Sequence, residues 1–350
     1  MNKKITIYTL AEELEVSAST VSRAFNPTSR LSPEKRARIL AAARKYGFSP
    51  NRAAARLSRQ DIRIGVTIVN RIPAFYEAMY NGILTAEREL AWQKVTADVR
   101  MLSPGNDIGE RWTQVLNEFR ETGCDGVILH GIYDQDAVFK INELVDAGIP
   151  VVTLHNDLPA SKRLFNSTSN TRMIGEIAAE LLSALIHRPR KNVVIFTGSM
   201  SSLIHQQLFL SFSSACPREG LTLLQNYDTM DMPAFAQRLV EEAFSTRDDI
   251  DGIYVSSANS IPICEYLEKH NLAGKVALVT SDTFEQLNAY IRSGVVSATI
   301  YQDPFRQGKN AFTNLYRHIV ENAEIPHILQ SNPQIVMRSN LSLFEDKQQP

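Results

Sequence analysis

The sequence predicts a small all-α domain at the N-terminus, followed by an α/β body of two lobes, each a doubly wound parallel sheet. Three observations support this fold class. Residues 1–60 carry helix signals and twelve Lys and Arg against four Glu, a formal net charge of +8. From Ile62 on, short Val- and Ile-rich runs alternate with amphipathic stretches, which is typical of parallel sheets covered by helices on both faces. The body is longer than one comfortable hydrophobic core, which favours two lobes.

The composition excludes several classes of protein. No apolar run approaches the roughly eighteen residues needed to cross a bilayer, and the N-terminus has no apolar stretch of the signal-peptide kind. Cys124, Cys216 and Cys264 lie far apart and form no CxxC pair, which argues against a zinc site or a disulfide framework. The chain has no glycine-rich phosphate-binding fingerprint. We therefore expect a cytoplasmic protein without a metal ion or cofactor.

The division of charge along the chain indicates what the N-terminal domain contacts. Against the +8 of residues 1–60, the remaining residues hold 25 basic and 34 acidic side chains, a formal net charge of −9. A small basic domain on an acidic body is expected to bind a polyanion that the body itself repels. A basic face that is merely solvated is the alternative.

Residues 6–48 are expected to form three short helices. Ser17 is well placed as the N-cap of the second helix. The third helix has the strongest start signal, with Ser32 as cap and Pro33 at the first helical position, and Gly47 is expected to end it. The small core that we expect consists of Leu10, Leu14, Val16, Val21, Ile39, Leu40 and Ala43.

Two short helices joined by a tight turn, with a compact third, are typical of a helix-turn-helix, whose second helix enters the major groove of DNA. Because Val21 faces the core, its neighbours on this helix are expected to point outward. Arg23 could pair with guanine or lie on a phosphate, and hydroxyl and amide groups suit phosphates. Each of them could instead be a solvated polar side chain. The candidates for DNA contact are Ala18, Ser19, Thr20, Ser22, Arg23 and Asn26.

The run from Thr9 to Asn26 resembles the signature of the lactose-repressor and galactose-repressor family, whose Val-Ser-x-x-Thr-Val-Ser-Arg pattern is intact. Glu15 stands where the family usually has a glycine. Ala18 and Ser19 occupy the family's base-reading positions and are small. The resemblance implies a transcription regulator, most often a repressor, which binds palindromic operator DNA as a homodimer and responds to a small effector molecule.

The next segment resembles the hinge of the same family, with its Pro-Asn-x-x-Ala-x-x-Leu pattern. Asn51 could cap a helix that is too short to be stable alone in water, so we expect it to fold only on DNA, against its dimer mate. Ala54 permits close approach, and Leu57 is the expected apolar wedge in the minor groove. Arg52 and Arg56 flank this wedge on phosphates. The alternative is a plain helical linker whose Leu57 docks on the body.

The body is expected to alternate strands and helices. Helical stretches include Tyr76–Ala91, Arg172–Ile186 and Phe305–Val320. The strand candidates are Ile62–Val69, Val95–Val99, Gly126–His130, Val151–His155, Val193–Thr197, Gly252–Ser256, Val276–Ser281 and Ala298–Tyr301.

Ligands of parallel sheets gather at the carboxyl ends of the strands, where this chain offers amides, a carboxylate and aromatic rings. Amides and a carboxylate can bond several hydroxyl groups, while a ring covers the apolar C–H face of a polyol. Each such residue taken singly is more often a helix cap or a turn former. The candidates at strand ends are Asn70, Phe75, Tyr76, His155, Asn156, Asn259, Asp282 and Gln302.

The body also resembles periplasmic sugar-binding proteins of the ribose-binding type, in stretches 151–156, 279–282 and 298–304. The resemblance implies a periplasmic-binding-protein-like domain with a sugar, a cyclitol or a related polyol as effector. It assigns ligand contacts to Phe75, Tyr76, Asn259, Asp282 and Gln302.

Two departures from that group concern charge. His155 and Asn156 stand where the group usually has Asp-Arg, and the helix after Gly198, which usually supplies an Arg, offers His205 instead as a candidate donor. These losses disfavour a simple pentose. Neither histidine has a partner at metal-binding spacing, so both are expected to be hydrogen-bonding residues.

The expected domain organisation is a helix-turn-helix domain at 1–49, a hinge helix at 50–60 and an effector-binding and dimerisation domain at 61–340. Its N-lobe is expected at about 61–157 and 303–325, and its C-lobe at about 158–302 and 326–340. Residues 341–350 form a tail without the leucine heptads that tetramers of the family carry, so we expect a dimer. Ligand that closes the lobes is expected to decide whether the hinges pair on DNA.

Three other functions remain open. The chain could be a constitutive DNA-binding regulator whose body only dimerises. A sugar-processing enzyme is a further alternative, since α/β lobes also host sugar chemistry, but it gives no reason for the basic head. A transport-type binding protein needs an export signal.

Overall fold

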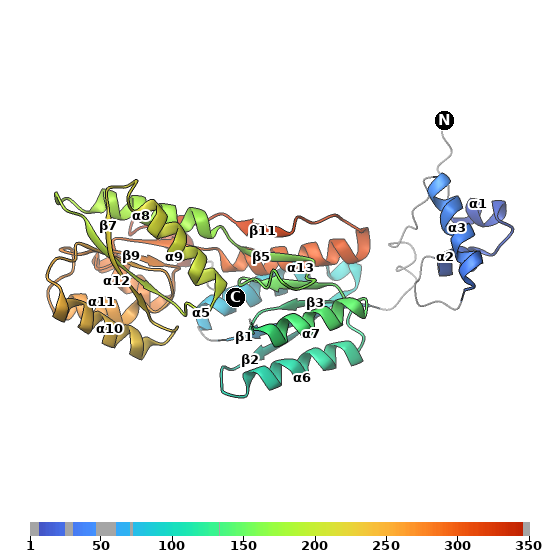
Figure 1. Ribbon diagram of the computed structural model, residues 1–350, viewed down its shortest axis with the longest axis horizontal. Coiled ribbons are helices and arrows are strands. Elements are labelled where there is room, and N and C mark those ends of the chain that lie inside the picture. Colours follow the sequence, from blue (N-terminus) through green and yellow to red (C-terminus); the bar gives the residue numbers. More distant parts are fainter. Residues whose placement is uncertain (1–6, 25–30, 47–60, 71–72, 133, 346–350) are drawn as a thin grey trace. The chain divides into compact units, whose positions relative to one another are not determined.

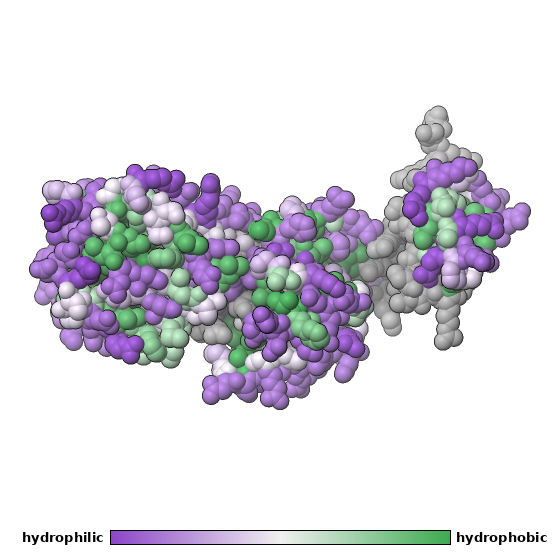
Figure 2. Space-filling view, in the orientation of Figure 1, coloured by the Kyte–Doolittle hydropathy of each residue, from purple (hydrophilic) through white to green (hydrophobic). Residues whose placement is uncertain are grey.

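The computed structural model describes residues 7–24, 31–46, 61–70, 73–132 and 134–345. The chain divides into two compact units, one made chiefly of residues 1–60, here called the head, and a larger one, here called the body, of residues 61–319 and 323–350 (Figure 1). Among the described residues, no helix combines the length and the apolar character that crossing a membrane requires. Hydrophilic residues predominate on the face of each unit that Figure 2 shows.

Three helices form the described part of the head: α1 (Ile7–Glu13), α2 (Ala18–Ala24) and α3 (Pro33–Lys45). The predicted N-caps are confirmed. Ser17 Oγ accepts a hydrogen bond from Thr20 N at 3.1 Å, and Ser32 Oγ accepts one from Lys35 N at 3.4 Å. These bonds satisfy N–H groups that have no partner within the first turn of a helix. The expected stop at Gly47 lies outside the described residues.

The head encloses a small core of its own. Of the expected core residues, Leu14 and Val16 are partly buried and pack against this core, while Leu40 is partly buried and is not part of it. Ala18, which was expected to point outward, also packs against the core. Ala18 lies three residues before Val21, and residues at this spacing share one face of a helix. The fully buried members are Leu10, Ala11, Val21, Ala24, Ile39 and Ala43.

The first lobe of the body is built on a parallel sheet with the strand order β11-β5-β4-β3-β1-β2. Helices of this lobe are α5 (Pro73–Glu89), α6 (Ile108–Glu121) and α7 (Gln135–Asp146), with a short 3-10 helix at Ala91–Gln93. The strands are β1 (Ile62–Val69), β2 (Val95–Leu102), β3 (Gly126–Leu129), β4 (Val151–Leu154), β5 (Phe165–Ser169) and β11 (Ile328–Ser331). Helix α13 (Pro304–Glu321) completes the lobe, because Leu315 and Ile319 pack on Gly126 of β3.

The second lobe has a sheet of order β12-β10-β9-β8-β6-β7, parallel except for β12. Hydrophobic residues are buried on both faces of this sheet. Helices α8 and α9 cover one face, and helices α10, α11 and α12 cover the other (Figure 1). The strands are β6 (Asn192–Thr197), β7 (Thr222–Asp228), β8 (Gly252–Val255), β9 (Ala277–Ser281), β10 (Ala298–Tyr301) and β12 (Gln334–Val336). The helices are α8 (Thr171–Leu185), α9 (Leu203–Ala215), α10 (Pro233–Thr246), α11 (Ile261–Lys269), α12 (Glu285–Ser293) and α14 (Ser342–Glu345).

The sheets correct the lobe borders expected from sequence. Strands β5 and β11 belong to the first sheet, so residues 158–169 and 326–331 lie in the first lobe and not in the second. Strand β5 was not predicted, because Asn166-Ser167-Thr168-Ser169 shows no apolar run, yet all four residues are buried. Their polar groups are satisfied by hydrogen bonds, for example from Asn166 Nδ2 to Thr153 Oγ1 at 3.0 Å.

The C-terminal segment also differs from the expected tail. Residues 342–345 form α14, and Leu341 and Phe344 are buried in the core of the second lobe. The ring of Phe344 contacts that of Tyr301 edge to face, with centroids 5.3 Å apart. The chain therefore uses these residues for packing rather than as a free tail.

Candidate functional site

A cavity of about 390 Å³ lies where the carboxyl ends of the strands of both lobes meet. This is the place where open parallel sheets bind ligands, because their loops leave the strands there. We call it the cleft. Its described walls are Phe75, Tyr76, His130, Gly131, Ile132, Asp134, His155, Asn156, Ser199, Ser201, Ser202, Ile204, His205, Leu208, Asp231, Ser256, Ser257, Ala258, Asp282 and Gln302.

The structure brings together most of the predicted effector residues. Asn70 and Asn259 do not line the cleft. Asn70 N extends the pairing of β1 with β2 by donating to Leu102 O at 2.8 Å, while Asn259 is buried and donates from Nδ2 to Thr229 Oγ1 at 3.4 Å. The seven that line the cleft are Phe75, Tyr76, His155, Asn156, His205, Asp282 and Gln302.

One end of the cleft is aromatic. The rings of Phe75 and Tyr76, at the start of α5, meet edge to face with centroids 5.3 Å apart. The imidazole of His155 lies 4.8 Å from the ring of Phe75, and that of His130 lies 4.6 Å from the ring of Tyr76, centroid to centroid. This group of four rings gives the first lobe an apolar wall with polar edges, which suits a ligand that alternates C–H and O–H groups.

Burial keeps His155 uncharged. It directly follows β4 in the left-handed region at φ 67°, and its Nδ1 lies 3.2 Å from Gln307 Oε1. Because that amide oxygen can only accept, Nδ1 carries the proton and Nε2 is left as an acceptor. Removal from water lowers the pKa of His155 from 6.5 to about 4.

Asp282 is the buried carboxylate of the cleft. It follows β9 in the left-handed region at φ 62°, and both its oxygens accept from Gln302. Oδ1 accepts from the backbone N at 2.9 Å and Oδ2 from Nε2 at 2.7 Å. Burial nevertheless raises the pKa of Asp282 to about 7, and the nearby charge of Asp303 acts in the same direction. Each oxygen can accept further hydrogen bonds from a ligand in the cleft.

Asn156 joins the two lobes across the cleft. It follows β4 in the first lobe, and its Nδ2 donates to Ser202 Oγ, just before α9 of the second lobe, at 2.9 Å. Its Oδ1 accepts from Ile204 N, in the first turn of α9, at 3.2 Å. A side chain of one lobe thus caps a helix of the other.

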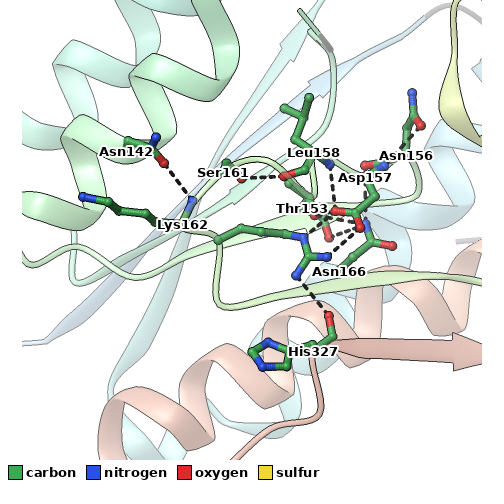
Figure 3. Close-up of polar contacts among 10 residues, drawn as sticks. Asn142, Thr153, Asn156, Asp157, Leu158, Ser161, Lys162, Asn166 and His327 are labelled. Carbon is green, nitrogen blue, oxygen red and sulfur yellow. Dashed lines mark hydrogen bonds and ion pairs between the residues drawn. The ribbon is translucent and has the colours of Figure 1, made fainter. Parts of the chain in front are cut away.

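A buried ion pair holds the loop that carries Asn156. Asp157 accepts hydrogen bonds from Thr153 Oγ1 at 3.0 Å and from Leu158 N at 2.7 Å (Figure 3). Arg163 Nη2 donates to Asp157 Oδ2 at 2.6 Å, and Arg163 Nη1 donates to His327 O at 3.2 Å. Because 8% of the Arg163 side chain and 14% of the Asp157 side chain are exposed, the pair is shielded from solvent and fixes where Asn156 points.

The second-lobe wall contains a carboxylate that holds a loop. Asp231 Oδ2 accepts from Ser199 N at 3.1 Å, and Oδ1 lies 3.5 Å from Nε2 of His205. Met230 and Asp231 are both left-handed, at φ 52° and 56°, a conformation that costs free energy for residues other than glycine. A Cβ on Gly198 would lie 2.2 Å from Asp231 Oδ1 and 2.3 Å from His205 Nε2, so a side chain at this position would displace their contact.

His130, Asp231 and Ser256 line the cleft but are not among the effector residues predicted from the sequence. His130 and Ser256 are the last residues of two predicted strands, so the rule that ligands meet strand ends could have found them. Asp231 follows β7, whose sequence Thr-Leu-Leu-Gln-Asn-Tyr-Asp has no continuous apolar run and was not predicted as a strand. No group of three or more His, Cys, Asp or Glu among the described residues could hold a metal ion.

The predicted DNA contacts are described only in part. Ala18 and Thr20 lie on α2, and Thr20 Oγ1 is 2.8 Å from Ser17 Oγ. The backbone of Ser19, Ser22 and Arg23 is helical, while their side chains lie outside the described part. The remaining candidates, which also lie outside the described residues, are Asn26, Asn51, Arg52, Ala54, Arg56 and Leu57.

Comparison with known proteins places this geometry in a family. Residues 64–323 match the family model described as "Periplasmic binding protein domain", and residues 6–51 match that of "Bacterial regulatory proteins, lacI family". The chain belongs to the periplasmic binding protein domain family. With a lacI-family helix-turn-helix before this domain, the two resemblances and the predicted fold class are confirmed.

Two named relatives match part of the chain at moderate identity. Catabolite control protein A of Priestia megaterium is 26% identical over 64% of this chain, and HTH-type transcriptional regulator DegA of Bacillus subtilis is 26% identical over 63%. The chain spans 64% and 63% of the length of these two relatives.

Solved structures show the same fold. GanP, a glucose-galactose binding protein from Geobacillus stearothermophilus, superposes with a TM-score of 0.72 at 21% identity, covering 81% of this chain and 99% of GanP. A putative LacI transcriptional regulator from Bacteroides fragilis superposes with a TM-score of 0.71 at 18% identity, with the same coverage.

Proposed function

We propose that this protein is a DNA-binding transcription regulator whose affinity for an operator is controlled by a small molecule in the cleft. The observation that carries the proposal is the combination, in one chain, of a lacI-family helix-turn-helix at residues 6–51 with a cleft of the periplasmic-binding-protein type. The names of the relatives, a catabolite control protein and an HTH-type transcriptional regulator, agree with it.

The head is proposed to read operator DNA in the major groove. Two features support this: α2 is held between α1 and α3 by a core of its own, and α3 alone carries Lys35, Arg36, Arg38, Arg44 and Lys45. A helix-turn-helix uses such basic groups on phosphates, while its second helix reads bases. Arg23 is the side chain that we expect to discriminate most between bases.

We propose that two chains bind a palindromic operator as a homodimer and act as a repressor. The hinge that the sequence indicates would then supply Leu57 as a wedge at the centre of the operator, with Arg52 and Arg56 on phosphates. Dimerisation through the body would set the spacing of the two heads, so that the half-sites lie a whole number of helical turns apart.

The effector is proposed to be a sugar, a cyclitol or a related polyol. The rings of Phe75 and Tyr76 would cover its C–H face, and Asp282 and Gln302 would bond its hydroxyl groups. Sugar-binding proteins are among the related solved structures, such as the glucose-galactose binding protein GanP. We propose that the cleft binds its ligand without turning it over.

Coupling between the cleft and the DNA-binding head is proposed to act through the two lobes of the body. A ligand in the cleft contacts both lobes, so it changes the free energy of their closure, and with it the packing of two bodies in a dimer. The two hydrogen bonds of Asn156 across the cleft support this route, because they join the two lobes directly.

Selection of duplexes from a random library by the full chain tests the proposal. We expect enrichment of a palindrome, and loss of about tenfold in affinity for it on Arg23→Ala, as for a side chain that reads a base. Arg190→Ala, at an exposed position of the body, is the matched control and should leave the affinity unchanged. Failure to enrich any sequence at moderate salt contradicts the proposal.

A further inference from the structure

Gln307 lies outside the cleft but in contact with one of its walls. It stands near the start of α13, is fully buried, and is not among the described walls of the cleft. Both polar groups of its backbone are held: Gln307 N donates to Asp303 O at 3.2 Å, and Ser167 Oγ donates to Gln307 O at 2.8 Å. Because a buried amide must find its partners inside the protein, the partners of this side chain indicate what it does.

The stretch of α13 that carries Gln307 is packed tightly on α5. A Cβ on Gly82 of α5 would lie 2.0 Å from Phe305 O of α13. A Cβ on Gly308 of α13 would lie 2.1 Å from Met79 O of α5. The two helix backbones are therefore closer than residues with a side chain would allow at these two positions. Since Gln307 stands between the two contacts on α13, its backbone is fixed relative to α5.

The orientation of the Gln307 amide is determined by Gln302. Nε2 of Gln307 donates to Gln302 O at 3.0 Å, and a carbonyl oxygen can only accept. Gln302 is itself held, because Ser331 Oγ donates to its backbone O at 2.8 Å and Ser169 Oγ donates to its Oε1 at 3.0 Å. These four residues are each at most 4% exposed, so water does not compete for their hydrogen bonds. The end of the Gln307 amide that faces His155 is therefore its oxygen.

This amide oxygen decides which ring nitrogen of His155 carries the proton. Nδ1 of His155 lies 3.2 Å from Gln307 Oε1, and two acceptors at this distance would repel each other. Burial lowers the pKa of His155 to about 4, so at neutral pH the imidazole has a single N–H, and it is placed on Nδ1. Nε2 lies on the other edge of the ring, turned away from Gln307. The ring itself lines the cleft and is held beside Phe75.

We infer that Gln307 is a positioning residue of the effector site: it fixes His155 as the Nδ1–H tautomer, so that Nε2 accepts a hydrogen bond from a hydroxyl group of the ligand. With the proton on Nε2 instead, the same wall would donate and would select ligand groups that only accept, such as ether or carbonyl oxygens. Gln307 thus contributes to the choice of ligand without touching it. This inference rests on the proposed function of the cleft as an effector site.

The tautomer of His155 can be measured directly in the full chain by nitrogen NMR. Isotopically labelled histidine gives separate signals for protonated and unprotonated ring nitrogens, and the signals that disappear in His155→Gln are those of His155. At neutral pH we expect the Nδ1–H form to exceed the Nε2–H form by about tenfold, because one net hydrogen bond changes an equilibrium constant by about this factor.

Three variants separate the positioning role from general disturbance. Gln307→Met keeps the length of the side chain without its amide and should lower the ratio of the two tautomers by about tenfold. Gln307→Glu keeps an acceptor in the same place and should keep the proton on Nδ1, which provides a second test if Gln307→Met does not fold. Gln114→Met is the matched control: Gln114 Nε2 donates to Glu118 Oε1 within α6 at 3.1 Å, and its loss should leave the signals of His155 unchanged.

Glucose and galactose serve as probes of the contact with the ligand. A bound sugar should shift the Nε2 signal of His155 more than its Nδ1 signal. Gln307→Met should bind that sugar about twofold more weakly, because only about half of its molecules then hold the accepting tautomer. Predominance of the Nε2–H form in wild type, the same tautomer ratio in wild type and Gln307→Met, or a shift of Nδ1 alone on sugar binding overturns the inference.

The proposed function has a separate readout in the same experiment. A sugar that binds the folded chain raises its melting temperature by mass action. If neither glucose nor galactose does so, the assignment of these sugars to the cleft fails, whereas the tautomer ratios of the free chain and its variants still decide whether Gln307 positions His155.

Discussion

Asn156 and Ser202 lie on opposite lobes and are joined across the cleft by a hydrogen bond of 2.9 Å from Nδ2 to Oγ. The same amide accepts from Ile204 N, so one buried side chain of the first lobe caps α9 of the second. The position is one where the sugar-binding group that this body resembles usually has an arginine. In this chain the position makes a contact between the two lobes.

Removal of this link should loosen the closed arrangement. Asn156→Ala leaves Ile204 N without its partner, and a buried donor that loses its acceptor costs about 1–3 kcal/mol of unfolding free energy. Urea unfolding measures this loss, and small-angle scattering should show a larger radius of gyration. Asn142→Ala is the control, because Asn142 bonds Lys162 N within the first lobe and should change stability without changing the radius. An unchanged radius in Asn156→Ala argues against the link.

Asp282 should make the protein less stable as the pH rises. Its pKa is raised from 3.8 to about 7 in the folded state, so the folded chain keeps this proton longer than the unfolded chain does. Its stabilising contribution is full below pH 3.8 and is lost as the pH rises to about 7, at up to about 1.4 kcal/mol per pH unit. As the pH rises from 3.8 to about 7, the unfolding free energy of Asp282→Asn should therefore increase relative to that of wild type. A constant difference would contradict the raised pKa.

His155 should make the protein less stable as the pH falls. Its pKa is lowered from 6.5 to about 4, so the unfolded chain binds this proton more readily, and stability is lost as the pH falls from 6.5 to 4. His155→Gln keeps a polar side chain but does not titrate. As the pH falls, its unfolding free energy should therefore rise relative to that of wild type. His187→Gln, at an exposed position, provides the baseline and should run parallel to wild type.

A side chain at Gly198 should destabilise the protein. Gly198→Ala places a methyl group against the His205 and Asp231 contact, and overpacking of this kind costs about 1–3 kcal/mol. Gly109→Ala is the matched control: nothing lies within 4 Å of its Cβ position, and alanine in helix α6 should raise stability by up to about 1 kcal/mol. Thermal unfolding compares the two, and equal melting temperatures would show that the contact can shift at little cost.

Glu15 should be replaceable by glycine with a gain in stability. It stands in the turn between α1 and α2 at φ 52°, which costs a residue with a Cβ roughly 1 kcal/mol. Hydrogen exchange of the amides of α1 and α2 in the full chain should slow in Glu15→Gly. In Glu12→Gly, an exposed position within α1, it should quicken, because glycine destabilises a helix interior.

Sequence patterns predicted the elements whose signals are local. The caps Ser17 and Ser32 have the residue types that satisfy free N–H groups, and the two-lobed fold follows from apolar strands alternating with helices. The cleft was located from strand ends alone, since parallel strands deliver their carboxyl ends to one edge. Ala18 was expected to point outward, but it lies three residues before Val21 and therefore shares the face of α2 that packs on the core.

The remaining features depend on contacts between distant segments. Strand β5 is polar, and its burial is paid for by partners such as Thr153 and Gln307, which no local pattern indicates. Asp231 reaches the cleft through a left-handed turn after an amphipathic strand. The link from Asn156 to α9 joins residues of two lobes, and its partners Asn156 and Ser202 lie 46 residues apart in the sequence.

Fluorescence anisotropy of the full chain on a selected palindromic duplex, with and without a saturating polyol that raises its melting temperature, tests the central claim most directly. We predict that the polyol changes the dissociation constant for DNA by between about 5-fold and 150-fold. Asp282→Asn should bind the duplex normally and lose this response. A dissociation constant that stays the same at saturating polyol, with wild type bound specifically to the duplex, would contradict control of the head by the cleft.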